Sequence, residues 1–182
     1  MYVIEATVPG DSASRNGELT IGIGPVALPE YLDRKEILTH DQDYRVNAAE
    51  FDRWAEPLEH NIASALATNL SMLGPAENVV TYPWGTVYEV DYVIHVRVHA
   101  YGTSPSGEVL LSASWVVLDA ENKAIKLSNN RYTETRQGDD VVATVAAMSR
   151  ALEQLSRDIA DVLVVSAARS TTSPATMAGS QR

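Results

Sequence analysis

Apolar residues recur along this chain with two periods, and each period predicts a different element. Between residues 54 and 73 they follow steps of four and three, which predicts an amphipathic helix with the stripe Leu58, Ile62, Leu66, Leu70 and Leu73. Pro57 has to lie in the first turn, where a missing amide proton is not needed. The helix is therefore predicted to begin near Arg53 or Trp54, and Gly74-Pro75 predicts its end.

A second long helix is predicted after Gly138-Asp139-Asp140, which has the residue types of a helix cap. Its apolar seam covers three heptads: Val141, Val145, Met148, Leu152, Leu155, Ile159 and Val162. Packing on a sheet is favoured because three heptads are short for a coiled coil, although self-association through this seam leaves a homo-oligomer open. Residues 169–182 lack periodicity and are predicted to form a disordered tail, which leaves residues 1–168 as a single domain.

Alternation with period two predicts the strands. The clearest runs from Val90 to Tyr101 and places its apolar residues, including Tyr92 and Ala100, on one face, and Asp91, His95, Arg97 and His99 on the other. Val93 is the apolar exception on that polar face. A wet face predicts an antiparallel neighbour, and a hairpin loop at 102–107 leads into a strand from Val109 to Leu118.

Three further strands are predicted from shorter patterns. A polar segment from Ile125 to about Thr135 suits the edge of a sheet. Apolar, β-branched residues predict a strand from Tyr2 to Val8, and alternation predicts another from Leu19 to Leu28. Within the latter, Gly22 and Gly24 indicate a bulge or a close approach of another group to the backbone.

Composition narrows the classes of function. A formal net charge of -10 argues against nucleic acid as a partner, because phosphate binding needs clustered Lys and Arg. Cysteine is absent, which excludes disulfides, thiolate nucleophiles and Cys-built zinc sites. No apolar run reaches the roughly 20 residues of a membrane-spanning helix, and the first residues do not have the pattern of a signal peptide.

Candidate reactive residues do not assemble into a known catalytic motif. His95 and His99 lie roughly 13 Å apart along one strand, too far to share a metal ion. Ser112 and Ser114 alternate on a strand without a nucleophile-elbow motif, and Gly22-Ile23-Gly24-Pro25 is an incomplete phosphate loop. The sequence therefore predicts no catalytic residue, metal ligand or cofactor site, and indicates a protein that is not an enzyme.

Four short elements occur in order along the chain: Pro29-Glu30-Tyr31-Leu32-Asp33-Arg34, Trp54-Ala55-Glu56-Pro57-Leu58, Ala67-Thr68-Asn69-Leu70-Ser71 and Ser112-Ala113-Ser114-Trp115. Together with the long last helix they resemble the auxiliary lipoprotein family of ABC-type transporters. The resemblance covers the chain from Tyr2 to about Val165.

The resemblance implies an α/β fold, with a mixed sheet packed with two long amphipathic helices in an anticodon-binding-domain-like sandwich. It also implies a non-enzymatic auxiliary subunit in the periplasm of a Gram-negative cell, tethered to the outer membrane by an N-terminal lipid anchor. The lipidated cysteine of the family is absent from this chain. Members act beside MCE-domain transporters that move lipids between the two membranes, which supports envelope integrity.

The elements that carry the resemblance also supply candidate contact residues. Partner binding is predicted at Tyr31, Leu32, Arg34, Trp54, Glu56 and Pro57, because aromatic residues and arginine are favoured at interfaces. The competing interpretation is that Trp54 and Leu58 pack the helix start onto the sheet. Two other functions stay open: a carrier that holds a lipid or small hydrophobic ligand between the last helix and the Tyr92/Trp115 face, and a hydrolase.

Overall fold

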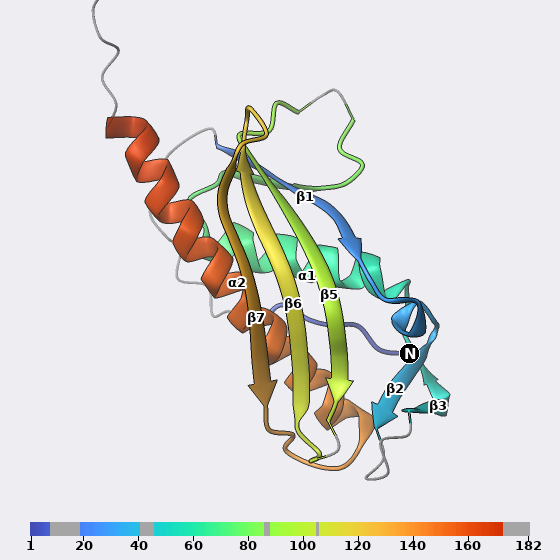
Figure 1. The fold of residues 1–182 in the computed structure, drawn as a ribbon. Coiled ribbons are helices and arrows are strands. Elements are labelled where there is room, and N and C mark those ends of the chain that lie inside the picture. Colours follow the sequence, from blue (N-terminus) through green and yellow to red (C-terminus); the bar gives the residue numbers. More distant parts are fainter. Residues whose placement is uncertain (8–18, 41–45, 86–87, 105, 173–182) are drawn as a thin grey trace, which may run out of the picture.

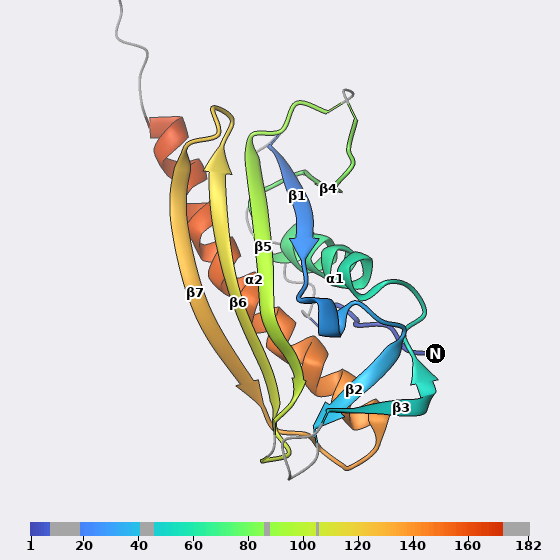
Figure 2. The ribbon, with the colours of Figure 1, turned by 45° about the vertical axis from the view of Figure 1, so that its right-hand side comes forward.

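Two long helices lie on one face of a five-stranded mixed sheet, and within the described residues the other face carries no helix (Figures 1 and 2). The structure is a computed structural model, and it describes residues 1–7, 19–40, 46–85, 88–104 and 106–172. The strands are β1 (Thr20–Ala27), β4 (Asn78–Thr81), β5 (Tyr92–Thr103), β6 (Val109–Asp119) and β7 (Ala124–Glu134). The helices are α1 (Leu58–Leu73) and α2 (Val141–Thr172).

The sheet order is β4-β1-β5-β6-β7, with β1 parallel to β4 and β5 and the other pairs antiparallel. The predicted α/β class, with a mixed sheet and two long helices, is confirmed. The antiparallel neighbour of β5 and the edge position of β7 are confirmed as well. β4 and a separate two-stranded sheet of β2 (Glu36–His40) and β3 (Val46–Arg53) were not predicted.

Helix α2 packs its apolar seam on the sheet, as the heptad pattern predicts. Leu152, Leu155 and Ile159 are fully buried. Burial of each such side chain contributes about 1.5–3 kcal/mol to the free energy of unfolding. Because the seam is buried within one chain, a homo-oligomer has to use another surface. The cap is confirmed too, since the backbone amide of Ala143 donates to Oδ1 of Asp140 at 2.7 Å.

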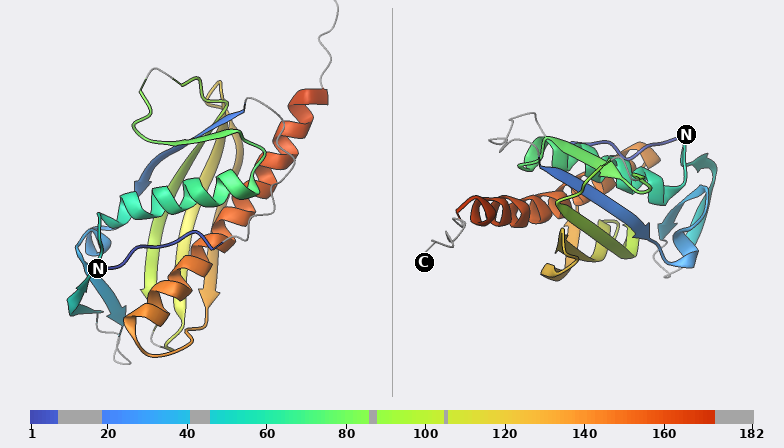
Figure 3. Two further views of the ribbon diagram at one scale, coloured as in Figure 1. Left: turned by 180° about the vertical axis from the view of Figure 1, so that it is seen from behind. Right: turned by 90° about the horizontal axis from the view of Figure 1, so that it is seen from above.

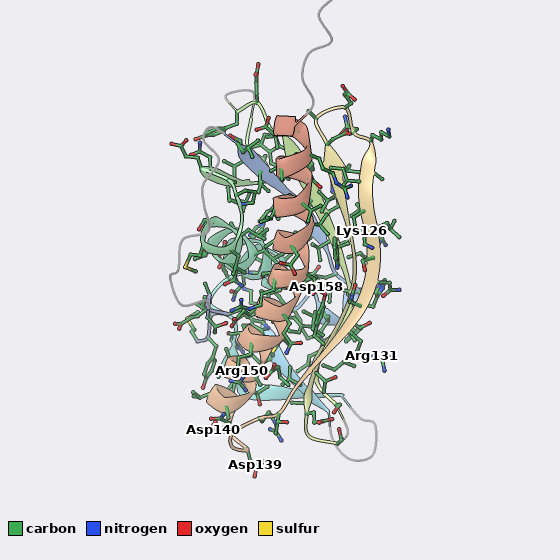
Figure 4. All side chains as sticks on the ribbon, turned by 90° about the vertical axis from the view of Figure 1, so that its left-hand side faces the viewer. Lys126, Arg131, Asp139, Asp140, Arg150 and Asp158 are labelled. Carbon is green, nitrogen blue, oxygen red and sulfur yellow. The ribbon has the colours of Figure 1, made fainter. Side chains whose placement is uncertain are left out.

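Helix α2 continues to Thr172, four residues beyond the predicted domain end at 168. The remainder of the predicted tail lies outside the described residues. Along its length α2 is tied to the edge strand by polar contacts. The Tyr132 hydroxyl donates to Oδ2 of Asp158 at 2.7 Å, and Nε of Arg150 donates to Oε2 of Glu134 at 3.0 Å. Figure 4 shows Asp158 on the side of α2 that faces β7.

Helix α1 begins at Leu58, so its predicted start near Arg53 or Trp54 is wrong. The backbone of Trp54 makes non-helical hydrogen bonds instead. Its amide donates to the carbonyl of Lys35 at 2.8 Å, and the residue forms a parallel bridge with Tyr2. Pro57 therefore precedes the helix, with non-helical backbone angles of φ -50 and ψ 133. The predicted end is confirmed, because the Gly74 amide donates to the carbonyl of Leu70 at 2.8 Å.

The predicted strand from Tyr2 to Val8 is wrong over the described residues 1–7, which form an extended strap with one isolated bridge. The strap finds its hydrogen-bond partners on the helices. The Ile4 amide donates to Oδ1 of Asn61 on α1 at 2.9 Å, and the Glu5 amide donates to Oγ of Ser149 on α2 at 3.1 Å. Figure 3 shows this segment running across the helix layer, on the side away from the sheet.

A register shift and a close side-chain contact shape the sheet. Pairing between β5 and β6 shifts register between Val98 and Ala100, so Tyr101 is buried where continued alternation predicts Ala100. The Tyr101 hydroxyl donates to the carbonyl of Met148 at 2.8 Å, and burial raises its pKa well above 10. On β1 the prediction of a close approach at Gly22 is confirmed, because a Cβ there would lie 2.9 Å from Cγ1 of Val90 and 3.1 Å from Cη2 of Trp84.

Candidate functional site

The predicted contact residues gather at the end of the molecule that holds β2, β3 and the amino terminus (Figure 1). Pro29, in extended conformation, leads into a short 3-10 turn, η1 (Glu30–Leu32), closed by a hydrogen bond from the Leu32 amide to the Pro29 carbonyl at 2.9 Å. The turn points Leu32 inward and leaves Tyr31 at the surface. The two adjacent predicted contact residues of this turn therefore differ: Leu32 belongs to the core and Tyr31 to the surface.

Leu32 and Trp54 belong to the core, with only 3% and 5% of their surface exposed. They border a small internal space together with Leu38, Leu58 and Tyr101. The interpretation that Trp54 and Leu58 pack the start of α1 therefore describes their place in this chain. A residue with so little exposed surface offers little to a partner unless the fold opens.

Tyr31, Arg34, Glu56 and Pro57 are exposed and remain the candidate contact residues. The Tyr31 hydroxyl donates to the backbone carbonyl of His99 on β5 at 3.3 Å, which holds the ring beside the sheet. Partial burial of that ring raises the pKa of Tyr31 above 10. The predicted role of these four side chains in partner binding stays a prediction.

The amino terminus lies at the same end. The Tyr2 amide donates to the Arg53 carbonyl at 3.0 Å, and the Ala55 amide donates to the Tyr2 carbonyl at 2.9 Å. Met1 is exposed, while Ile4 is buried a few residues later. These hydrogen bonds hold the backbone in place from Tyr2 onward. Tyr2 lies at the same end of the molecule as the exposed candidate contact residues.

The face of the sheet opposite the helices forms a second candidate surface, here called the outer sheet face. The register places on it the odd positions of β5 from 93 to 99, the even positions of β6 from 110 to 118 and the odd positions of β7 from 127 to 133. A shallow groove of about 440 Å³ crosses it, bordered by Pro25, Ala27, His95, Arg97 and Leu127. Sequence reasoning missed this surface, although Val93 on the polar face of its strand was a signal.

Two reactive side chains meet on this face. Nε2 of His99 lies 3.0 Å from Oγ of Ser114, the distance of a nucleophile and its general base. Sequence spacing did not predict the pair, because the register shift after Val98 sets their relation. In hydrolases a third group orients the histidine, and among the described residues no carboxylate is hydrogen-bonded to His99. The arrangement is that of a polar cross-strand pair.

The expected ligand pocket between the last helix and the Tyr92/Trp115 face is filled by the protein itself. Tyr92 and Trp115 are buried beneath α2, whose side chains occupy that space. The margin of this region is open: Tyr92 borders a groove of about 400 Å³ that also touches Arg169 near the end of α2. A carrier function would need a different cavity.

Within the described ranges, no group of three or more His, Asp or Glu side chains is arranged to hold a metal ion. The same part of the chain has no helix that is both long and apolar enough to cross a membrane.

Comparison with known proteins relates these features to a family. The family described as ABC-type transport auxiliary lipoprotein component matches residues 2–160. The intermembrane transport lipoprotein PqiC of Escherichia coli K12 is 25% identical over 137 residues, which is 75% of this chain and 71% of PqiC. PqiC of Shigella flexneri matches with the same values.

Solved structures share the fold. Protein XCC0632 from Xanthomonas campestris is similar with a TM-score of 0.76 at 12% identity, covering 95% of this chain and 100% of that one. An uncharacterised protein gives a TM-score of 0.69 at 21% identity, with 82% and 93% covered. The PelC dodecamer from Paraburkholderia phytofirmans gives 0.51 at 17% identity, with 86% and 96% covered.

Proposed function

This chain belongs to the family of ABC-type transport auxiliary lipoprotein components, and we propose that it is a non-enzymatic subunit of a lipid transport system in the cell envelope. Its partner is an MCE-domain protein of that transporter, and its contribution to lipid trafficking and envelope integrity is made through protein contacts. The observation that carries the proposal is the family match over residues 2–160, which spans every strand and most of α2.

The location proposed for the full-length protein is the periplasm, with an N-terminal lipid anchor in the outer membrane. The strap supports a defined orientation for such an anchor. Because Tyr2 and Ile4 are hydrogen-bonded to Arg53 and Asn61, an anchor just upstream would hold the body close to the membrane. The end that carries Tyr31 and Arg34 would then face the bilayer, and the carboxyl end of α2 would point away from it (Figure 3).

A carrier for a lipid or another hydrophobic ligand is the second candidate function. It is favoured by a groove of about 600 Å³ between the strap and the start of α2, bordered by Met1, Val3, Val142 and Ala146. This volume falls in the range of about 300–1,000 Å³ that is typical of small-molecule sites. Native mass spectrometry of gently purified protein distinguishes the two functions: a stoichiometric bound lipid supports the carrier, and bare protein supports the contact subunit.

Self-assembly is a further part of the proposal, through a surface other than the buried heptad seam. A related fold occurs in PelC as a dodecamer. Light scattering of the purified chain decides between a monomer and a ring or smaller oligomer.

The proposal is tested by purifying the tagged full-length protein from its native envelope after mild solubilisation. We expect an MCE-domain transport protein to co-purify, and deletion of the gene to increase envelope permeability to large hydrophobic compounds. Unchanged permeability together with the absence of any transport protein from the eluate would contradict the proposed function.

A further inference from the structure

We propose that the outer sheet face is the docking surface for a partner protein that presents carboxylates beside apolar side chains. This inference rests on the proposed function and specifies the surface and chemistry by which the transport partner is recognised. It is carried by three properties of the face: its charge, its exposed apolar residues and its shape.

The charge of the outer sheet face is opposite to that of the whole chain. The chain has 24 acidic residues and a formal net charge of -10, yet none of the positions that define this face is Asp or Glu. The face carries Arg97 and Arg131 instead, with His95 and His99 on the same side of β5. Arg131 lies on the side of β7 away from α2 (Figure 4).

Both guanidinium groups are available to a partner. The ion pairs of the described residues involve other basic side chains, namely His60, Arg136, Arg150 and Arg157. Arg97 and Arg131 are exposed on a face without acidic neighbours in its own strands. Guanidinium groups pair with carboxylates through bidentate hydrogen bonds, and complementary charge guides two surfaces together.

Apolar residues share this face with the two cations. The register places His95, Val116 and Leu127 in one row across three strands, and Arg97, Ser114 and Asn129 in the next. Leu127 exposes 73% of its surface in the middle of a strand, next to the groove of about 440 Å³. Leu127 and Arg97 border the same groove, which combines an exposed apolar side chain with a cation. Arginine and apolar surface are both common at protein interfaces.

The shape favours a protein over a lipid as the occupant. β5, β6 and β7 pair over 11 or so residues each, which gives a continuous face roughly 35 Å long. Lipids and other small ligands bind in concave cavities that enclose most of their surface, whereas the groove on this face is shallow and open. A protein interface of standard size, about 800 Å² on each partner, suits such a surface.

The outer sheet face also adjoins the contact residues predicted from the sequence. The Tyr31 hydroxyl bonds to the backbone of His99, which is the last of the odd positions of β5 on this face. Tyr31 therefore extends the surface toward the end that holds the amino terminus. A partner seated on β5–β7 would reach that aromatic ring without covering the strap.

Two double charge reversals test the inference in the tagged full-length protein, purified from its native envelope. Arg97→Glu/Arg131→Glu changes the outer sheet face, and Lys123→Glu/Arg169→Glu makes the same change of charge at exposed positions off that face. We expect the first variant to retain roughly tenfold less of the MCE-domain protein than the wild type, and the second to retain it. Equal retention by both variants overturns the inference and leaves the proposed function standing.

Three controls make the result decisive. If the wild type retains no transport protein, the proposed function fails and the inference with it. Thermal unfolding shows whether both variants fold; should Arg97→Glu/Arg131→Glu unfold, Leu127→Asn tests the same face, with the same loss expected. Flotation with phosphatidylglycerol vesicles covers the other occupant: loss of vesicle binding by the first variant, with the partner protein still retained, identifies a lipid surface and overturns the inference.

Discussion

The backbone amide of Ile4 donates a hydrogen bond to Oδ1 of Asn61 at 2.9 Å, and both residues are buried. This contact joins the first residues of the chain to the first turn of α1, so these residues are part of the folded body. If the proposed lipid anchor precedes this segment, the contact would limit how freely the body moves around it.

Asn61→Ala is expected to lower the free energy of unfolding by about 1–3 kcal/mol, because it leaves the buried Ile4 amide without an acceptor. Chemical denaturation measures the loss, and hydrogen exchange at Ile4 should accelerate. Asn129→Ala is the matched control at an exposed position, with a change within about 0.5 kcal/mol. Unchanged exchange at Ile4 would show that the strap is held by other contacts.

Glu153 predicts a dependence of stability on pH. Burial raises the pKa of its carboxyl, but hydrogen bonds from the Thr7 hydroxyl and from Arg157 at 2.6 Å outweigh this and hold the pKa below 4.5. A folded-state pKa below the unfolded value stabilises the protein above about pH 4.5, and this contribution is lost as the pH falls through the folded-state pKa.

Glu153→Gln should therefore reduce the loss of stability between about pH 5 and pH 3 in urea titrations. Thr7→Val should reduce it by a smaller amount, because the Arg157 contact remains. A Glu153→Gln variant with the same acid limb as the wild type would mean that the carboxyl is not held by these partners.

Gly22 and Gly24 should respond differently to alanine. A Cβ on Gly22 would lie 2.9 Å from Cγ1 of Val90 and 3.1 Å from the ring of Trp84, and displacing that packing costs about 1–3 kcal/mol. A Cβ on Gly24 would lie 2.5 Å from Nδ1 of His95, an exposed ring that can rotate away, and 3.2 Å from the Ile94 carbonyl, which has to give by only a few tenths of an ångström. We expect Gly22→Ala alone to change the near-ultraviolet signal of the tryptophans. Equal effects of the two variants would contradict this packing.

The seam of α2 offers a test of packing against self-association. Leu155→Ala should cost about 2–5 kcal/mol because Leu155 is fully buried, whereas Val164→Ala, at 44% exposure, should change stability by less than about 0.5 kcal/mol. The mass measured by light scattering should be the same for both variants. A lower mass for Leu155→Ala would show that the seam joins two copies.

The sequence predicted correctly the elements in which buried residues recur with a regular period along the chain. The leucine stripe of α1, the alternation of β6 and the seam of α2 each follow one periodicity along most of the element, and burial enforces that pattern in the fold. The predictions that failed concern residues whose structure depends on a hydrogen-bond partner elsewhere in the chain. Trp54 was assigned to a helix because nothing nearby signals that its amide bonds to Lys35.

The same limit explains what was missed at the candidate surfaces. Tyr31 and Leu32 are adjacent and similar in sequence character, and only the geometry of η1 separates the exposed ring from the buried side chain. The contact between His99 and Ser114 depends on a register shift between β5 and β6. The alternation of polar and apolar residues in the sequence does not reveal that shift. The cationic outer sheet face became visible only when pairing placed Arg97 and Arg131 on one side of the sheet.

The most direct measurement of the central claim, that this protein works by docking on another transport subunit, is photo-crosslinking in living cells. A photoreactive phenylalanine analogue is placed at Leu127 on the outer sheet face, and at Val164 on the exposed side of α2 as the control. We predict an adduct with an MCE-domain transport protein from position 127 and none from position 164. Adducts with that protein from neither position, or from position 164 alone, would contradict the account.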